Sequence, residues 1–276
     1  ISIDGYGIIN HGARVGSSTN WLQTHSATNT HWHCAISLHG VDGYYQGEGI
    51  NVIGQRTFGG IFGRMNNSII KGTVDAGESP RANQDGFKLI GPSTNNLFVN
   101  VTASVGDDAI SVMGNDLAPG AVNTAGTGVG IIGEAGWNGG PIYGTRIENL
   151  YLKPPTFYGV RVGSKAEYVG QLEIDGIYGQ TRSHAVHIDN YTEDPSQFNG
   201  PDGTGNLGTV SIKNINARVG DMTYYSATIW INAAGESISI VGNQSDYASP
   251  YRLFPHVLMN TNSVWKQVNI EGLQLT

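Results

Sequence analysis

The sequence predicts an all-β protein, and within that class a right-handed, single-stranded parallel β-helix, on three observations. Glycine accounts for 40 of the 276 residues, whereas Asp, Glu, Lys and Arg together make up only 13%, which disfavours long solvated helices. Short runs of alternating apolar and polar residues recur along the chain, as half-buried strands require. These runs return about once every 20 to 30 residues, which is typical of one coil of a solenoid.

Two series of predicted strands interleave along the chain. The first series consists of residues 68–71, 97–101, 146–150, 172–174, 210–213, 238–240 and 268–270. The second series consists of residues 87–90, 109–112, 129–132, 160–162, 185–188 and 228–231. If each coil contributes one strand to each series, equivalent residues of successive coils stack about 4.8 Å apart. The abundant Gly and Asn suit the tight bends between strands, because both tolerate positive φ.

A β-sandwich is the competing fold. It would need hairpin turns between most strands, whereas the Asp-Gly pairs of this chain mostly abut strands of unequal spacing. The solenoid is therefore the prediction. We expect one catalytic β-helix domain over residues 1–276, and a start in mid-pattern without a leader indicates a piece of a longer chain.

Composition excludes several classes of function. The net charge is −7, from 22 acidic and 15 basic residues without a basic run, so nucleic acid is not an expected partner. No apolar stretch approaches the roughly 20 residues of a membrane-spanning helix, so we expect no membrane insertion. The one cysteine, Cys34, excludes internal disulfides and cysteine-rich zinc sites.

His31 and His33 lie close to Cys34 in the sequence and could suggest a metal site. Alternating side chains on a strand point to opposite faces, however, so we expect no metal and no cofactor.

Three aspartates stand at the starts of two consecutive strands of the second series. Asp85 precedes Gly86, and Asp107 and Asp108 follow one predicted coil later. Stacked on one face, these like charges would raise the pKa of at least one member. Such a cluster offers a protonated carboxyl beside a carboxylate, which is the pair that inverting glycoside hydrolysis uses. A structural role at strand ends or a calcium site fits the three residues equally well.

Four motifs in order carry a resemblance to a known family: N-x-D-G at 83–86, G-D-D at 106–108, G-T-G-x-G-I-I-G at 126–133 and G-V-R-V at 159–162. Together they resemble the polygalacturonase (pectinase) family of glycoside hydrolases, which have the pectin-lyase-like β-helix. The similarity runs from residues 3–7 to residues 210–215 and so covers most of the chain. It implies an enzyme that hydrolyses O-glycosyl bonds of a polysaccharide.

The resemblance also implies roles for individual residues. Asp107 would be the general acid, Asp85 and Asp108 would activate the attacking water, and Arg161 and Tyr191 would contact the sugar. These assignments hold only for the positions of this chain that match the family's motifs.

Two positions of the predicted substrate site depart from the family pattern. Thr127 stands where the pectinases have the histidine of a His-Gly pair, and Gly163 stands where they have the lysine of Arg-x-Lys, with Lys165 two residues later. Both departures remove groups that would recognise a galacturonate, so we expect a different sugar at the cleaved position. His187, with His184 beside it, is a candidate to replace the missing histidine by contacting sugar hydroxyls.

The single cysteine and the many Gly and Asn bends are similar to the β-helical tailspike proteins of bacteriophages. This similarity implies an endo-acting, inverting depolymerase of bacterial surface polysaccharide, located outside the cell as a component of the virion tail and assembled as a homotrimer. A secreted bacterial pectinase of the polygalacturonase type is the alternative. Two further alternatives belong to other classes, a calcium-dependent polysaccharide lyase of the same architecture and a non-catalytic glycan-binding β-helix.

Overall fold

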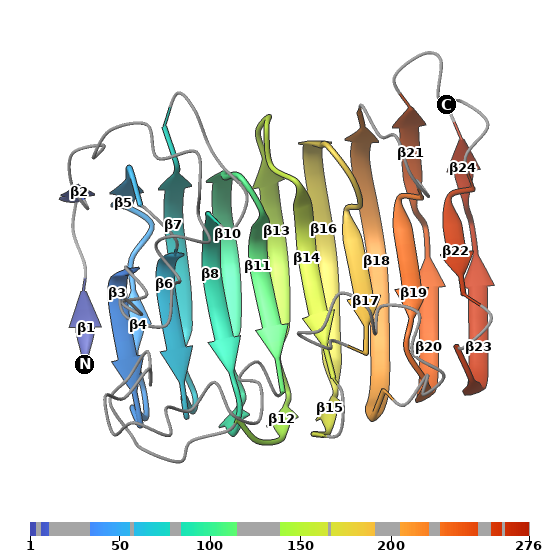
Figure 1. Cartoon of the computed structure of the whole chain (residues 1–276), viewed down its shortest axis with the longest axis horizontal. Helices are drawn as coiled ribbons and strands as arrows, with labels where there is room; N and C mark the ends of the chain where they lie inside the picture. Colours follow the sequence, from blue (N-terminus) through green and yellow to red (C-terminus); the bar gives the residue numbers. More distant parts are fainter. Residues whose placement is uncertain are drawn as a thin grey trace, which may run out of the picture.

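The computed structural model describes residues 1–3, 7–10, 34–55, 58–77, 84–114, 139–164, 167–190, 205–220, 227–247, 255–260 and 263–275. The strands stack side by side along the long axis of the molecule, with β1 at one end and β24 at the other (Figure 1). All pairings between named strands are parallel. The chain is therefore a parallel β-helix, and the sandwich alternative is wrong.

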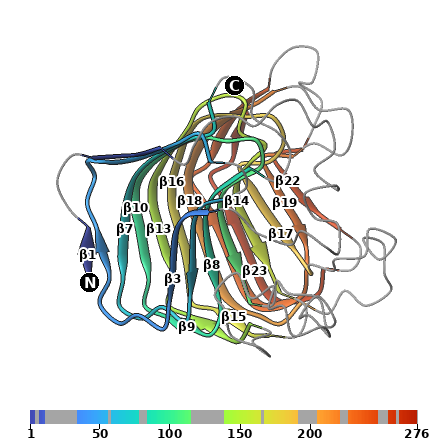
Figure 2. The same cartoon turned by 60° about the vertical axis from the view of Figure 1, so that its left-hand side comes forward.

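Sheet B holds eight strands in chain order and corresponds to the second predicted series. They are β3 (Cys34–His39), β6 (Phe58–Gly63), β8 (Asp85–Ile90), β11 (Asp108–Met113), β14 (Tyr158–Gly163), β17 (Val186–Asp189), β19 (Ile229–Asn232) and β22 (Val257–Met259). Figure 2 shows this sheet set at an angle to the strands of the first series.

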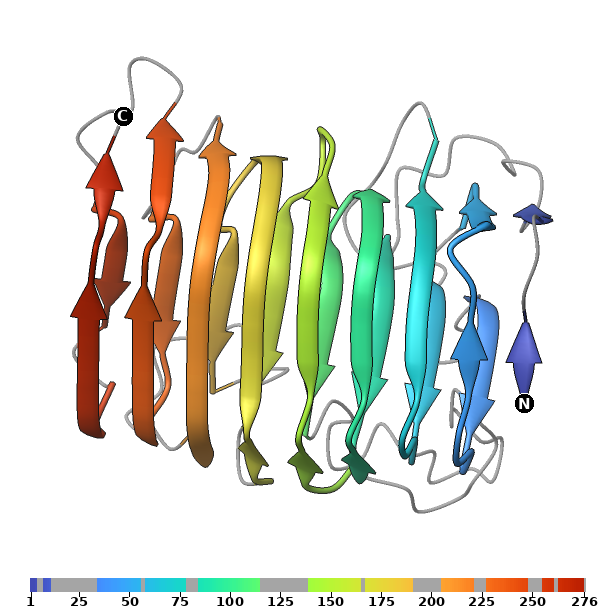
Figure 3. The ribbon, with the colours of Figure 1, turned by 180° about the vertical axis from the view of Figure 1, so that it is seen from behind.

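Sheet A holds the other sixteen strands and includes the first predicted series; its long strands lie in front in Figure 3. They are β1 (Ser2–Ile3), β2 (Gly7–Asn10), β4 (Tyr45–Gln46), β5 (Ile50–Ile53), β7 (Ile69–Asp75), β9 (Ser93–Thr94), β10 (Leu97–Ser104), β12 (Ile142–Tyr143), β13 (Arg146–Leu152), β15 (Val169–Gly170), β16 (Leu172–Thr181), β18 (Leu207–Val219), β20 (Gly235–Val241), β21 (Gln244–Tyr247), β23 (Trp265–Glu271) and β24 (Gln274–Leu275).

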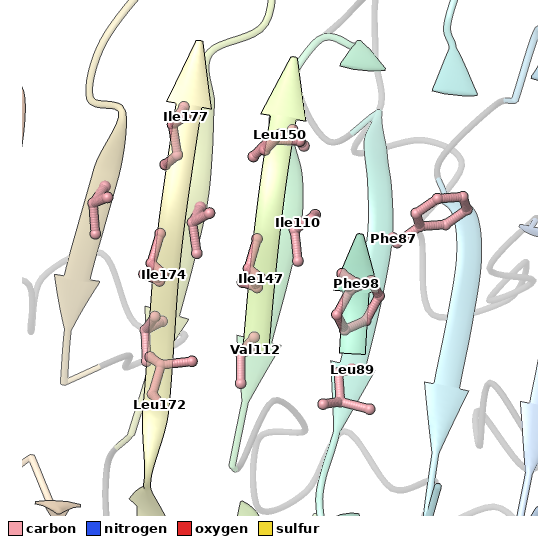
Figure 4. Close-up of a cluster of buried hydrophobic side chains, with 14 of the residues drawn as sticks. Phe87, Leu89, Phe98, Ile110, Val112, Ile147, Leu150, Leu172, Ile174 and Ile177 are labelled. Carbon is pink, nitrogen blue, oxygen red and sulfur yellow. The ribbon is translucent and has the colours of Figure 1, made fainter. Parts of the chain in front are cut away.

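The core lies between the two sheets and runs along the solenoid. In strands such as β7 every second residue is buried, because alternate side chains point to opposite faces. Figure 4 shows side chains that meet in this core, each at most 1% exposed: Phe87, Leu89, Phe98, Ile110, Val112, Ile147, Leu150, Leu172, Ile174 and Ile177. Stacking of equivalent apolar residues from coil to coil thus supplies most of the burial that stabilises the fold.

Asparagine and glycine occupy the bends, as the composition predicts. Asn100, Asn149 and Asn214 have φ values of 54°, 55° and 56°, in the left-handed region that few residue types adopt. The amide of Asn149 donates to Oδ1 of Asn100 at 3.2 Å. These two bends, which belong to neighbouring coils, are therefore linked by their side chains.

The prediction that residues 129–132 form a strand of the second series, between those at 109–112 and 160–162, is wrong for sheet B. Residues 129–132 lie outside the described residues, but β11 pairs directly with β14, with Asp108 opposite Tyr158. No strand therefore separates β11 from β14 in this sheet. The other five predicted strands of this series coincide with β8, β11, β14, β17 and β19. No helix among the described residues has the length and apolar character to cross a membrane.

Candidate functional site

A row of polar and aromatic side chains follows the outer face of sheet B from coil to coil. The strand register aligns these residues at one position: Lys88, Ser111, Arg161, His187 and Trp230. Their neighbours along each strand, such as Val160 and Val162, lie in the core, so the row itself faces outward. We call this row, together with the residues at the starts of the same strands, the outer strip.

An interruption of the usual inward–outward alternation at the strand start places the side chain of Asp108 on the outer face of sheet B. Ala109 and Ile110 are consecutive, yet both belong to the core, so the usual alternation is interrupted there. Asp108 is consequently on the outer side, where its Oδ2 lies 4.0 Å from Nη1 of Arg161. The neighbouring coil requires glycine at the matching place, because a Cβ on Gly86 would lie 2.2 Å from the backbone oxygen of Ala109.

Asp85 and Asp108 occupy equivalent places in adjacent strands. Phe87 is opposite Ile110, and each aspartate precedes its partner residue by two positions. Neighbouring parallel strands lie about 4.8 Å apart, so the two carboxylate-bearing positions stack on one another. Asp85 is 5% exposed and Asp108 only 2%, whereas Asp107 is half-buried. The three predicted catalytic aspartates thus come from two adjacent coils, at the starts of two middle strands of sheet B.

Burial raises the pKa of Asp108 to about 8, and the negative charge of Asp107 adds to this effect. The positive charges of Arg161 and Lys88 act in the opposite direction but are outweighed. Within the described residues, Oδ1 of Asp108 is buried without a hydrogen-bond partner. The Asp107–Asp108 pair can therefore keep a proton at neutral pH.

Arg161 is held by a second carboxylate from the next coil. Its Nη2 donates to Oδ2 of Asp189 at 2.9 Å, and Nε2 of His187 lies 3.2 Å from the same oxygen. Although burial would raise the pKa of Asp189, its interactions with Arg161 and His187 hold that pKa far below the usual carboxyl range. Asp189 is therefore ionised and forms a buried ion pair with Arg161.

Four rings from three successive coils pack together beside Arg161. Tyr158 stacks on His184 with centroids 5.5 Å apart, and His184 stacks on Trp230 at 5.7 Å. His187 meets Tyr158 and Trp230 edge-on, at 4.5 and 4.3 Å. Burial lowers the pKa of His184 to about 3, and burial also lowers that of His187, so both imidazoles are neutral at pH 7. We call these four residues the aromatic column.

The structure brings five of the seven predicted site residues together. Asp85, Asp107, Asp108, Arg161 and His187 all lie on adjacent strands of sheet B or at their starts. The other two predicted residues, Tyr191 and Thr127, lie outside the described residues, as do Asn83, Lys165, His31 and His33. The part of the chain that the structure describes holds no group of three or more His, Cys, Asp or Glu side chains placed to share a metal ion.

Sequence reasoning missed Asp189 and Trp230 as members of this site. A signal for both was present, because aligning the strands of the second series places Trp230 level with Arg161 and Asp189 level with Gly163. Gly163 is thus adjoined by a carboxylate of the next coil.

Fold and site together define a class, the parallel β-helices that carry a cluster of buried carboxylates on the outer face of one sheet. No protein-family model and no curated protein matches this chain. Among solved structures it is similar to the endo-xylogalacturonan hydrolase of Aspergillus tubingensis, with a TM-score of 0.65 and 13% identity, over 98% of this chain and 68% of that chain. This match confirms the predicted right-handed, pectin-lyase-like β-helix.

Two further structural matches have lower TM-scores. A family 28 exopolygalacturonase of Yersinia enterocolitica matches with a TM-score of 0.38 and 12% identity, over 82% of this chain and 46% of that chain. A polygalacturonase of Erwinia carotovora ssp. carotovora matches with a TM-score of 0.29 and 12% identity, over 86% of this chain and 59% of that chain.

Proposed function

We propose that the protein is an endo-acting glycoside hydrolase that cleaves a polysaccharide with inversion at the anomeric carbon. The observation that carries this proposal is the cluster of Asp85, Asp107 and Asp108 on adjacent coils, in which burial and like charge favour one retained proton. A carboxylic acid beside a carboxylate is the minimum that such hydrolysis requires. The β-helix shared with a xylogalacturonan hydrolase supports the same class of reaction.

Asp107 is the general acid in this proposal. It is half-buried and so can reach a substrate oxygen, whereas Asp108 is 2% exposed. Because adjacent carboxyls titrate together, the proton retained by the pair is available from Asp107. It passes to the leaving glycosidic oxygen, while Asp85 and Asp108 accept a proton from the water that attacks the anomeric carbon. The reaction consumes one water molecule for each glycosidic bond that it breaks.

The proposed substrate is a bacterial surface or capsular polysaccharide, and the proposed setting is extracellular, as a homotrimeric depolymerase of the tailspike type. Thr127 and Gly163 support a sugar other than galacturonate, because they replace the histidine and lysine of the pectinase pattern. Arg161 and His187 lie beside the carboxylates and would contact the sugar, as would Tyr191 and Thr127.

Replacement of the acid tests the mechanism. Asp107→Asn should lower the rate of reducing-end release from the true substrate by about 10² to 10⁴, because general acid catalysis contributes that much. Circular dichroism and the thermal midpoint should stay close to those of the wild type. The control is Asp175→Asn on β16, whose carboxylate lies 3.5 Å from Lys213 on sheet A, whereas the outer strip belongs to sheet B. Near-full activity of the Asp107 variant would contradict the assignment.

The products separate this proposal from its rivals. A hydrolase releases reducing ends without new absorbance near 235 nm, and proton NMR of the first product should show the inverted anomer. A lyase would give absorbance near 235 nm and lose activity with a chelator, and a non-catalytic glycan-binding protein would give no product.

The same assay on polygalacturonate tests the pectinase alternative. Reducing ends report cleavage, and light scattering on the same sample reports the oligomeric state. Rapid cleavage of polygalacturonate by a monomer would identify an ordinary pectinase instead.

A further inference from the structure

The positive charge of Arg161 is already matched by carboxylates of the protein. Asp189 accepts a hydrogen bond from its guanidinium at 2.9 Å, and Asp108 lies 4.0 Å away. Side chains of Asp108 and Asp189 are each 3% exposed and that of Arg161 is 15% exposed, so solvent screens these charges little. An anionic sugar placed against Arg161 would also face the ionised Asp189. The guanidinium is thus poorly suited to binding a uronate.

Among the described residues, the side chains next to Arg161 provide no compensating cation. His187 and His184 are each 4% exposed and belong to the aromatic column, and burial lowers the pKa of both imidazoles, which keeps them neutral. Lys88 is separated from Arg161 by strand β11, and its Nζ lies 4.8 Å over the ring of Phe58, on the N-terminal side. The C-terminal half of the described outer strip therefore presents rings and matched charges.

Two members of the aromatic column remain partly accessible. Tyr158 and Trp230 are half-buried, whereas the two histidines between them are buried. The stacked rings come from successive coils, so the column runs along the solenoid axis, away from Asp108. A polysaccharide lying along the outer strip would cross Tyr158 and then Trp230. The apolar C–H face of a pyranose ring packs well against such aromatic surfaces.

We propose that the subsite beside Arg161, over Tyr158 and Trp230, binds an uncharged sugar, and that Asp189 is the residue that excludes an anionic one. The proposal rests on the proposed polysaccharide hydrolase and names the chemical class of sugar that its site accepts. Trp230 supplies the stacking surface. Asp189 sets specificity in two ways, by neutralising Arg161 and by presenting a negative charge to any bound carboxylate.

Binding to matched oligosaccharides tests this proposal without requiring turnover. The probes are uronate-containing oligosaccharides, oligogalacturonate among them, each offered beside its carboxyl-reduced form, which has the same linkage and lacks only the charge. Binding is measured by calorimetry on the Asp107→Asn protein, so that cleavage does not interfere. We expect the reduced members to bind more tightly than the acidic ones. Asp189→Asn added to this background should shift the preference towards the acidic members by about tenfold.

Matched variants keep the result interpretable. Trp230→Ala should weaken binding of the neutral probes by about tenfold, and Trp230→Phe should weaken it less, because an aromatic face is kept. Asp175→Asn on sheet A removes one carboxylate elsewhere and should leave the preference unchanged. Tighter binding of acidic members by the Asp107→Asn protein, or binding of no neutral member, would overturn the inference. If neutral probes bind but the wild type releases no reducing ends, the hydrolase proposal fails and the neutral subsite stands.

Discussion

At the scale of single residues, the distance of a buried carboxylate from Arg161 decides whether it holds a charge or a proton. Asp108 and Asp189 are both 2% exposed, yet burial and the charge of Asp107 raise the pKa of Asp108, whereas Arg161 and His187 lower that of Asp189. The difference lies in position relative to Arg161, at 4.0 Å from Asp108 and 2.9 Å from Asp189. One cation shared unequally between two carboxylates therefore favours a retained proton on the Asp107–Asp108 pair and makes Asp189 a fixed anion.

The raised pKa of Asp108 predicts a pH-dependent stability that can be measured. Below its ordinary value of 3.8 the group is protonated in both the folded and the unfolded chain. As the pH rises towards 8, the unfolded chain releases this proton and the folded chain retains it, so the free energy of unfolding falls. Asp108→Asn removes this contribution. The variant should therefore gain at least about 1 kcal/mol relative to the wild type between pH 5 and pH 8 in urea unfolding.

Comparison with the wild type at each pH isolates this effect from the buried histidines. Burial lowers the pKa of His184 to about 3 and that of His256 to about 4, so both destabilise the fold as the pH falls below about 6.5, in the variant as in the wild type. A difference between the two proteins that stays constant from pH 5 to pH 8 would show that Asp108 titrates normally.

At the scale of elements, the bends of sheet A make the coils regular. Asn149 lies within β13 at a φ of 55°, opposite Asn100 of β10, which has a φ of 54°. Side-chain amides link these two bends, so each residue serves both the backbone conformation and the contact between coils. This dual role explains why asparagine, rather than glycine alone, occupies these places.

Substitution of Asn149 separates the two roles. Asn149→Ala should lower the free energy of unfolding by about 1 kcal/mol or more, because alanine loses the amide contact and disfavours positive φ. Asn149→Gly also loses the contact but tolerates the backbone conformation, so it should be the milder change. The measurement is urea unfolding of both variants. A glycine variant less stable than the alanine variant would contradict this explanation.

At the scale of the whole molecule, the solenoid is stabilised coil by coil, and its end coil differs from the middle. Strand β23 pairs with β20 and, among the described strands, with no other. Its flank carries exposed apolar side chains, with Val264 70%, Val268 48% and Ile270 40% exposed. Unpaired strand edges with apolar side chains favour association between chains.

The 276-residue chain should therefore self-associate through this edge as its concentration rises. Val268→Lys should reduce that association, because a lysine on an edge strand opposes further strand pairing. Tyr151→Lys is the control, since Tyr151 is 45% exposed on sheet A away from this end. Light scattering over a concentration series provides the measurement. Equal association of both variants and the wild type would place the contact elsewhere.

Much of the site could be predicted because its residues follow the coil repeat. Asp85 and Asp108 start successive strands, and Arg161 and His187 share one position of the repeat, so strand period and parallel register bring them together. The run at residues 129–132 fits the period of the sequence, but the direct pairing of β11 with β14 leaves no place for it between these two strands of sheet B. The assembly, the substrate and the single-domain extent over residues 1–276 stay predictions.

The sequence by itself determined the solenoid, its alternating core and the coils that carry the carboxylates, because these follow from local periodicity and residue type. Only the tertiary structure decided that Arg161 pairs with Asp189 and that Trp230 stacks on His184. The ion pair joins residues 28 apart in the chain, and that contact depends on how two strands stack. Protonation of Asp108 likewise depends on its burial, which belongs to the packed molecule as a whole.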